Sequence, residues 1–100
     1  MANHYLKATG NWAAATTWSD TDGGVAGAAF PVAGDDVFIT ANGNGLTLTI
    51  AAGAACKEFQ CTAGNTATIA GAADLTLTGQ AISFAATMTC THSGFIVFAP

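Results

Sequence analysis

The side chains that could do acid and base chemistry are few in this 100-residue chain. Hydrolases and lyases built on parallel β-helices place two or three carboxylates, often with a basic partner, in a groove along the outer face. Here only Glu58, beside Lys57, falls on an expected strand, where adjacent residues point to opposite faces. We therefore expect a structural role, as turn acceptors or solvated surface groups, for all six carboxylates: Asp20, Asp22, Asp35, Asp36, Glu58 and Asp74.

The other residues of catalytic or metal-binding type are isolated in the sequence. His4 and His92 have no acidic or thiol neighbour at ligand spacing, and no serine stands in a Gly-x-Ser-x-Gly context. The segment from Asp20 to Gly24 is similar to the opening of a calcium loop, but it lacks the later ligands and is interpreted as an acidic turn. The sequence thus predicts no enzyme and no catalytic, cofactor or metal site.

Three cysteines are an odd number, and their spacing matches no zinc motif. The alternation of apolar and polar residues turns Cys61 and Cys90 inward, beside Phe59 and Met88, so we expect buried free thiols that act as small hydrophobic groups. A disulfide would require stacking to bring two of the three, Cys56 included, within about 7 Å between Cα atoms.

The charge balance excludes several kinds of partner. Lys7 and Lys57 are the only basic residues besides the histidines, and the net charge is −4. Nucleic-acid binders need many cations to displace counterions from phosphates, so nucleic acid is excluded as a partner, and anionic membrane surfaces are excluded for the same reason. No apolar run approaches the roughly 20 residues of a membrane span. The first residues do not read as a secretory signal, so we expect synthesis and assembly in the cytosol.

The elements that must position these residues recur about every twenty positions from Asp36 onward. Alternation of period two predicts strands, and a step near twenty predicts that each pass of the chain stacks on the next. Two inner columns are expected, one of Val37, Ile39, Phe59, Cys61, Ile82 and Phe84, the other of Leu46, Leu48, Ile50, Ala67, Ile69, Met88 and Cys90. The fold predicted is all-β, a short right-handed parallel β-solenoid of about three rungs, with an antiparallel β-sandwich as the alternative.

Residues 1–34 lack this alternation and carry both tryptophans, so they are expected to form an irregular, aromatic-rich cap and attachment segment. Residues 35–100 would hold the rungs, within one structural domain. The last strand is apolar on both parities: we expect Phe95 and Val97 to face the core, which leaves Ile96 and Phe98 for a neighbouring subunit or for further chain.

Several motifs resemble the opening of bacteriophage virion proteins of the β-solenoid type. They are Gly-Asn-Trp12, Thr-Thr-Trp18-Ser, a glycine-rich stretch ending at Pro31, Gly-Asp-Asp-Val-Phe-Ile, and later Leu-Thr-Leu-Thr-Gly and Ser-Gly-Phe-Ile-Val-Phe-Ala. The resemblance implies a fibre or tail-appendage component, frequently trimeric, that binds other virion proteins through its amino-terminal part and is released by lysis. Such proteins are much longer than 100 residues, so the resemblance implies the amino-terminal part of one.

Three functions follow as hypotheses. The first is a virion fibre or appendage protein that works by adhesion. The second is a capsid decoration protein, and the third is a carbohydrate-processing fragment that would depend on Glu58 or Asp74. Aromatic and apolar residues are typical interface anchors, with intrachain packing the favoured role for Trp12 and Trp18. The candidate interface residues are Tyr5, Trp12, Trp18, Phe30, Ile96 and Phe98.

Overall fold

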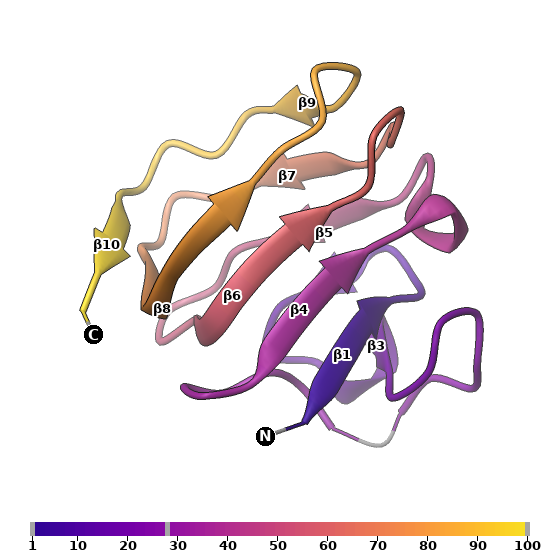
Figure 1. Cartoon of the computed structure of the whole chain (residues 1–100), viewed down its shortest axis with the longest axis horizontal. Coiled ribbons are helices and arrows are strands. Elements are labelled where there is room, and N and C mark those ends of the chain that lie inside the picture. Colours follow the sequence, from indigo (N-terminus) through magenta and orange to yellow (C-terminus); the bar gives the residue numbers. More distant parts are fainter. Residues whose placement is uncertain (1, 28, 100) are drawn as a thin grey trace.

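The computed structural model describes residues 2–27 and 29–99, and these form an all-β structure of two sheets (Figure 1). The described ranges contain no α-helix, only two short 3₁₀ helices, η1 (Ala15–Thr17) and η2 (Ala41–Gly43). Accordingly, no described helix is long and apolar enough to cross a membrane.

The larger sheet has six strands in the order β10-β8-β6-β4-β1-β3, and the smaller has four in the order β2-β5-β7-β9. The strands of the larger sheet are β1 (Asn3–Leu6), β3 (Trp18–Ser19), β4 (Asp36–Ile39), β6 (Ala55–Cys61), β8 (Leu75–Ser83) and β10 (Ile96–Phe98). Those of the smaller sheet are β2 (Gly10–Asn11), β5 (Thr47–Thr49), β7 (Thr68–Ala70) and β9 (Thr89–Cys90). Among these strands β1 and β3 pair antiparallel, and the other pairs are parallel.

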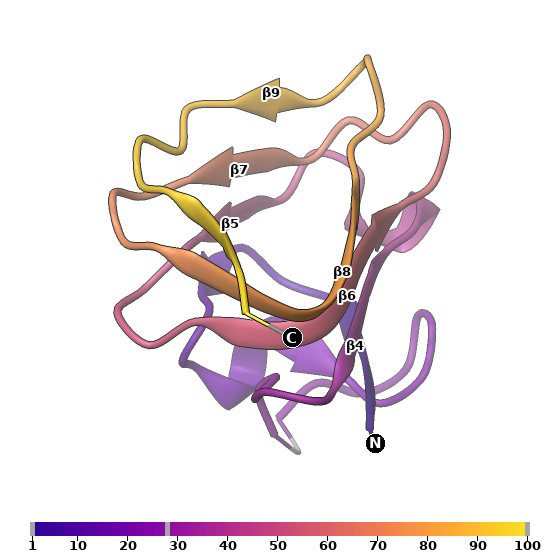
Figure 2. The same ribbon diagram turned by 60° about the vertical axis from the view of Figure 1, so that its left-hand side comes forward.

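From β4 onward, the paired residues lie 21 to 23 positions apart, as in Leu48 with Ile69 and Glu58 with Ala81. The chain alternates between the two sheets, and each pass lies over the previous one (Figure 2). Both predicted columns are confirmed as columns of parallel pairs: Val37 with Phe59 and Ile82 in the larger sheet, and Leu48 with Ile69 and Cys90 in the smaller.

A change of register between Cys56 and Glu58 explains why the step lengthens. Before it, Cys56 pairs with Leu77 at a step of 21, and after it, Glu58 pairs with Ala81 at a step of 23. Gly79 lies at this irregularity, where a Cβ atom would stand only 2.7 Å from the carbonyl oxygen of Lys57. Glycine therefore allows the two long strands to stay in contact across the bend.

The inner rows of the two sheets form one narrow core. In β1, β4, β5 and β7, alternation buries every second side chain, because successive side chains point to opposite faces. The core contains Leu6, Trp12, Trp18, Val37, Ile39, Leu48, Ile50, Ala54, Cys56, Phe59, Ala67, Ile69, Leu75 and Leu77. Its apolar burial is the main favourable term for folding, about 1.5–3 kcal/mol for each large side chain.

The amino-terminal segment was expected to be an irregular cap, but it contains strands that pair with the two sheets. β1 pairs in parallel with β4, with Asn3 opposite Asp36, and β2 pairs with β5. His4 and Leu6 point inward while Tyr5 stands between them on the outer face. The alternation of β1 gives only a weak strand signal, because the strand spans four residues and its inner row begins with a histidine.

The predicted orientation of the last strand is wrong. Ile96 pairs with the buried Leu75 and Phe98 with the buried Leu77, so Ile96 and Phe98 belong to the inner row. Phe95 is 76% exposed and Val97 lies on the same outer parity. Both faces of this strand are apolar, so alternation of apolar and polar residues does not indicate which face is buried. The strand pairs with β8 at a step of 21 positions instead of 20, which places Ile96 and Phe98 on the inner face.

Asn65 is a buried polar residue at a corner between passes. Its Nδ2 donates to the carbonyl oxygen of Thr40 at 2.8 Å, and its Oδ1 accepts from the amide of Ala67 at 2.8 Å. One pass later, Thr87 Oγ1 donates to the carbonyl oxygen of Asn65. The side chain thus joins two passes and satisfies a backbone amide within its own corner.

Replacement of Asn65 by alanine is expected to lower the free energy of unfolding by about 1–3 kcal/mol, because it leaves the Ala67 amide without its partner and removes one of the two hydrogen bonds that the Thr40 carbonyl accepts. Denaturation by urea measures the change. Asn44 is the matched control, since its exposed side chain accepts one hydrogen bond, from the amide of Thr66. An equal loss in the two alanine variants would contradict the role assigned to Asn65.

Candidate interface

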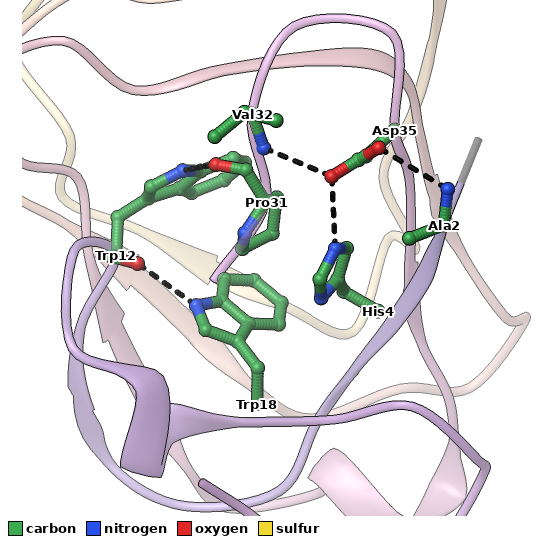
Figure 3. Close-up of polar contacts among 7 residues, drawn as sticks. All are labelled: Ala2, His4, Trp12, Trp18, Pro31, Val32 and Asp35. Atoms are coloured by element: carbon green, nitrogen blue, oxygen red, sulfur yellow. Dashed lines mark hydrogen bonds and ion pairs between the residues drawn. The ribbon is translucent and has the colours of Figure 1, made fainter. Parts of the chain in front are cut away.

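The two tryptophans proposed as candidate contacts are internal. Trp12 is 1% exposed and Trp18 is fully buried. The indole nitrogen of Trp18 donates to the carbonyl oxygen of Trp12 at 2.9 Å, and that of Trp12 donates to the carbonyl oxygen of Pro31 at 3.1 Å (Figure 3). Their rings meet edge to face at 5.2 Å, and Trp12 stacks on Phe59 at 6.2 Å. The favoured intrachain role is confirmed, and the pair anchors the amino-terminal segment to the core.

Tyr5 and Phe30 remain accessible, on different surfaces. Tyr5 is half-buried on the outer face of the larger sheet, where its ring stacks on that of Phe38 at 5.2 Å. Phe30 is 39% exposed in the loop before β4, and it lines a pocket of about 500 Å³ together with Val32, His4 and Asp35. The structure does not bring these two candidates together into one site.

His4 and Asp35 form an acid–histidine pair that the sequence spacing did not suggest. His4 is 3% exposed, and its Nε2 lies 3.0 Å from Oδ2 of Asp35. Oδ1 of Asp35 accepts from the amide of Ala2, and Oδ2 also accepts from the amide of Val32 (Figure 3). The expectation that His4 has no acidic neighbour is therefore wrong in space, because the parallel pairing of β1 with β4 joins residues 31 positions apart.

The surroundings of this pair indicate a structural role. Nδ1 of His4 is buried and has no hydrogen-bond partner among the residues that the structure describes. Nucleophilic catalysis needs a hydroxyl or thiol within hydrogen-bond reach of the imidazole. The pair instead ties β1 and the loop at Val32 to the start of β4.

Acid should weaken this connection. Burial raises the pKa of Asp35, but the hydrogen bonds from the amides of Ala2 and Val32 and the contact with His4 outweigh it, so the pKa lies below its ordinary value. Because the folded state favours the ionised carboxylate, Asp35 contributes stability above the unfolded pKa of about 4, and the contribution disappears as the pH falls through the folded pKa.

We therefore expect Asp35→Asn to lower the free energy of unfolding by about 1–3 kcal/mol at pH 7, and to make the loss of stability below pH 4 shallower than in the wild type. Urea denaturation at a series of pH values tests both effects. Asp20→Asn, which changes an exposed carboxylate, is the control and should leave the acid limb unchanged. Identical acid limbs in the wild type and Asp35→Asn would contradict the assignment.

Other carboxylates are engaged as the sequence predicted. Oδ1 of Asp22 accepts from Thr40 Oγ1 and from Asn42 Nδ2, and these hydrogen bonds lower the pKa of Asp22. Oδ1 of Asp74 accepts from the amide of Phe95 at 2.9 Å. The structural roles predicted for Asp22, Asp35 and Asp74 are confirmed by these contacts.

A shallow groove of about 550 Å³ runs along the corners of two successive passes, and Asp74 is its one ionisable lining residue. The other lining residues are alanines, Gly53 and Thr76. Glycoside hydrolysis requires two carboxyl groups facing each other across the scissile bond. Glu58 does not line the groove, and its carboxylate accepts from Gln60 Nε2 at 2.7 Å. The groove therefore gives no support to the carbohydrate-processing alternative.

The cysteines differ from one another in exposure. Cys56 is buried, and burial, with the nearby charges of Asp36 and Asp35, raises its pKa to about 12. Burial also raises the pKa of Cys61 to about 12, although part of this residue reaches the surface. The prediction that Cys90 is buried is wrong: Cys90 continues the inner column of Ile69, but it is exposed.

Cys90 belongs to a larger apolar surface on the last described pass. Its members continue the inner rows of the two sheets and are half-buried or exposed. We call this surface the open end, and it consists of Ile82, Phe84, Met88, Cys90, Ile96 and Phe98. Within residues 2–27 and 29–99, no strand pairs with the outer edge of β9 or of β10. The candidates Ile96 and Phe98 thus lie together, and the other four residues of the surface were expected to be core.

Comparisons of the chain with protein-family models, with curated proteins and with solved structures find no match. Function is therefore proposed from the geometry described above.

Proposed function

We propose that this chain is a structural module of a bacteriophage particle, folded as a short right-handed parallel β-solenoid of about three rungs, and that it acts by contact instead of catalysis. The steps of 21 to 23 positions between parallel pairs support the solenoid, since each pass buries its apolar row only against the next. The antiparallel alternative draws support only from the pairing of β1 with β3 and the bridge between Ser19 and Ala26.

The observation that carries the proposal is the open end. A protein surface of apolar side chains bordered by unpaired strand edges is suited to bind another protein by apolar contact and backbone hydrogen bonds. Phe98 is 51% exposed there and Phe84 is 44% exposed. Three carboxylates, by contrast, accept internal hydrogen bonds, those of Asp22, Asp35 and Asp74, whereas Oδ1 of Asp36 is buried without a partner among the residues that the structure describes.

The biological setting that we propose comes from the resemblance of several sequence motifs to virion proteins of the β-solenoid type. In that setting the chain is a fibre or tail-appendage component, its partners are other virion proteins and further copies of itself, and a trimer is the favoured oligomer. Its amino-terminal segment, held to the core by Trp12 and Trp18, would provide the attachment to the particle, and a longer protein would extend from it to the host. Assembly takes place in the host cytoplasm, and release follows lysis.

Quantitative mass spectrometry of gradient-purified virions tests the proposal. The expected result is that the chain sediments with the particle at a low and constant copy number. Hundreds of copies per particle would indicate a capsid decoration protein instead. If the chain stays in the soluble fraction of the lysate, or if it releases reducing ends from host polysaccharide and Asp74→Asn abolishes this release, the proposal is wrong.

A further inference from the structure

We infer that Asn44 is a site of spontaneous deamidation, at which the side-chain amide is lost as ammonia and the residue becomes aspartate or isoaspartate. Asn44 precedes Gly45, and Asn42 precedes Gly43, so the corner between β4 and β5 contains two Asn-Gly pairs. The structure gives the two pairs opposite surroundings. The reaction needs only the folded chain and water, so it does not depend on the proposed role in a virion.

The chemistry is an attack by backbone nitrogen on the preceding side chain. The amide nitrogen of Gly45 bonds to Cγ of Asn44, its proton passes through solvent to Nδ2, and Nδ2 leaves as ammonia when its bond to Cγ breaks. Water then opens the cyclic imide at either carbonyl carbon, which gives aspartate or isoaspartate without oxidation or reduction. The rate of such an intramolecular step depends on how freely the two atoms can approach each other.

The backbone around Asn44 leaves the attacking nitrogen free. Residues 43–46 form a type II turn, closed by the amide of Leu46, which donates to the carbonyl oxygen of Gly43 at 3.1 Å. Asn44 has φ −57° and ψ 135° in this turn, and Gly45 has a φ of +75°. The amide of Gly45 belongs to the central peptide and has no acceptor among the residues that the structure describes. Since glycine accepts both signs of φ, this peptide can rotate towards Cγ while the ends of the turn stay held.

A backbone amide also faces the oxygen on which charge develops. The amide of Thr66, in the next pass, donates to Oδ1 of Asn44 at 3.1 Å. Attack on Cγ converts this carbonyl oxygen to an oxyanion, and a hydrogen-bond donor already placed at that oxygen stabilises the charge. The contact that joins the two passes therefore also activates Cγ of Asn44.

Asn42 has the same successor but is protected. The amide of Gly43 donates to the carbonyl oxygen of Thr40 at 2.8 Å, so the attacking nitrogen is engaged. Gly43 is buried, and a Cβ atom there would stand 3.1 Å from Cγ2 of Ile39, so the peptide has little room to rotate. Nδ2 of Asn42 donates to Oδ1 of Asp22 at 2.9 Å. The negative charge of this carboxylate disfavours both a deprotonated amide and an oxyanion beside it.

Conversion of Asn44 changes the charge and the geometry of the corner. Each event adds one negative charge to a chain whose net charge is −4. The carboxylate of an aspartate can still accept from the amide of Thr66. In isoaspartate, by contrast, the main chain passes through Cβ, which lengthens the corner by one bond and separates it from the corner of the next pass. The modification therefore accumulates with the age of the protein and needs no enzyme.

Incubation of the whole chain in mildly alkaline buffer, followed by tandem mass spectrometry of its peptides, tests this inference. In the folded protein, conversion at Asn44 should be at least about tenfold faster than at Asn42. In concentrated urea the two rates should become nearly equal, because both residues precede glycine and neither is held by the fold. Asn42 is thus the matched control within the same chain.

Isoelectric focusing of two variants gives a second readout. The wild type should develop an acidic band with time, and Asn42→Gln should develop it at the same rate. In Asn44→Gln the band should form at least about tenfold more slowly, because glutamine must close a larger and less favourable ring. Circular dichroism establishes that both variants are folded before their rates are compared.

Three results would overturn the inference. They are a preference for Asn44 that is the same in folded and unfolded chains, an acidic band that forms as fast in Asn44→Gln as in the wild type, and a folded protein that does not convert while the unfolded chain does. None of these results affects the sedimentation of the chain with virions, so the proposed function stands or fails separately.

Discussion

Replacement of Trp18 by alanine is expected to lower the free energy of unfolding by about 3–5 kcal/mol, which is a large part of the stability of a domain of this size. The side chain is fully buried, and its indole nitrogen donates to the carbonyl oxygen of Trp12. The substitution leaves a large cavity beside the rings of Trp12 and His4 and removes the partner of that carbonyl. Urea denaturation followed by tryptophan fluorescence, with Trp12 still present, measures the effect.

Two further variants separate packing from hydrogen bonding. Trp18→Phe keeps most of the apolar volume but loses the indole donor, so it is expected to cost about 1–3 kcal/mol. Val25→Ala is the surface control, because Val25 is 90% exposed, and it should change stability by less than about 0.5 kcal/mol. If Trp18→Ala were no more destabilised than Val25→Ala, the amino-terminal segment would not be part of the cooperative core.

Replacement of Gly71 by alanine is the second change with a large expected effect, about 3 kcal/mol or more. Gly71 has a φ of +104°, and a Cβ atom there would stand 2.6 Å from the carbonyl oxygen and 2.9 Å from the amide nitrogen of Ile50. Backbone of the preceding pass therefore occupies the space that a side chain needs. Relief of the clash would separate the two passes and break the 2.8 Å hydrogen bond from the amide of Ile50 to the carbonyl oxygen of Ala70.

Gly64→Ala is the matched control for Gly71→Ala. Gly64 has a similarly positive φ of +79°, but no atom lies within 4 Å of the position of its Cβ. It should therefore show only the cost of a left-handed backbone, about 1–2 kcal/mol. The difference between the two variants, measured by thermal or urea unfolding, reports how tightly the passes are stacked. Equal losses would mean that the contact between Gly71 and Ile50 carries no energy.

Much of the fold from Asp36 onward could be predicted from the short-range alternation of apolar and polar residues. Val37, Phe59 and Ile82 stand in one column of parallel pairs, as their spacing indicated, and Leu48, Ile69 and Cys90 stand in another. Strand alternation has a period of two and is visible within a few residues, and repetition at a nearly constant step reveals which strands are neighbours.

The polar contacts could not be predicted in this way. His4 meets Asp35 only because β1 pairs with β4 across an intervening segment that contains β2 and β3. Asn65 is buried while Asn44, at the corresponding corner one pass earlier, is exposed, although each asparagine follows a glycine. Such contacts depend on the closure of long loops, which leaves no periodic signal.

The sequence by itself determined that the chain forms strands, which residues stand in the inner columns, and that ionisable groups are few. These features follow from composition and from local alternation of apolar and polar residues. Only the tertiary structure decided that Ile96 and Phe98, instead of Phe95 and Val97, continue the inner row, and that Cys90 is exposed although it lies in the column of Ile69. The physical reason is that alternation gives a side chain's face, whereas burial depends on whether another layer lies over that face.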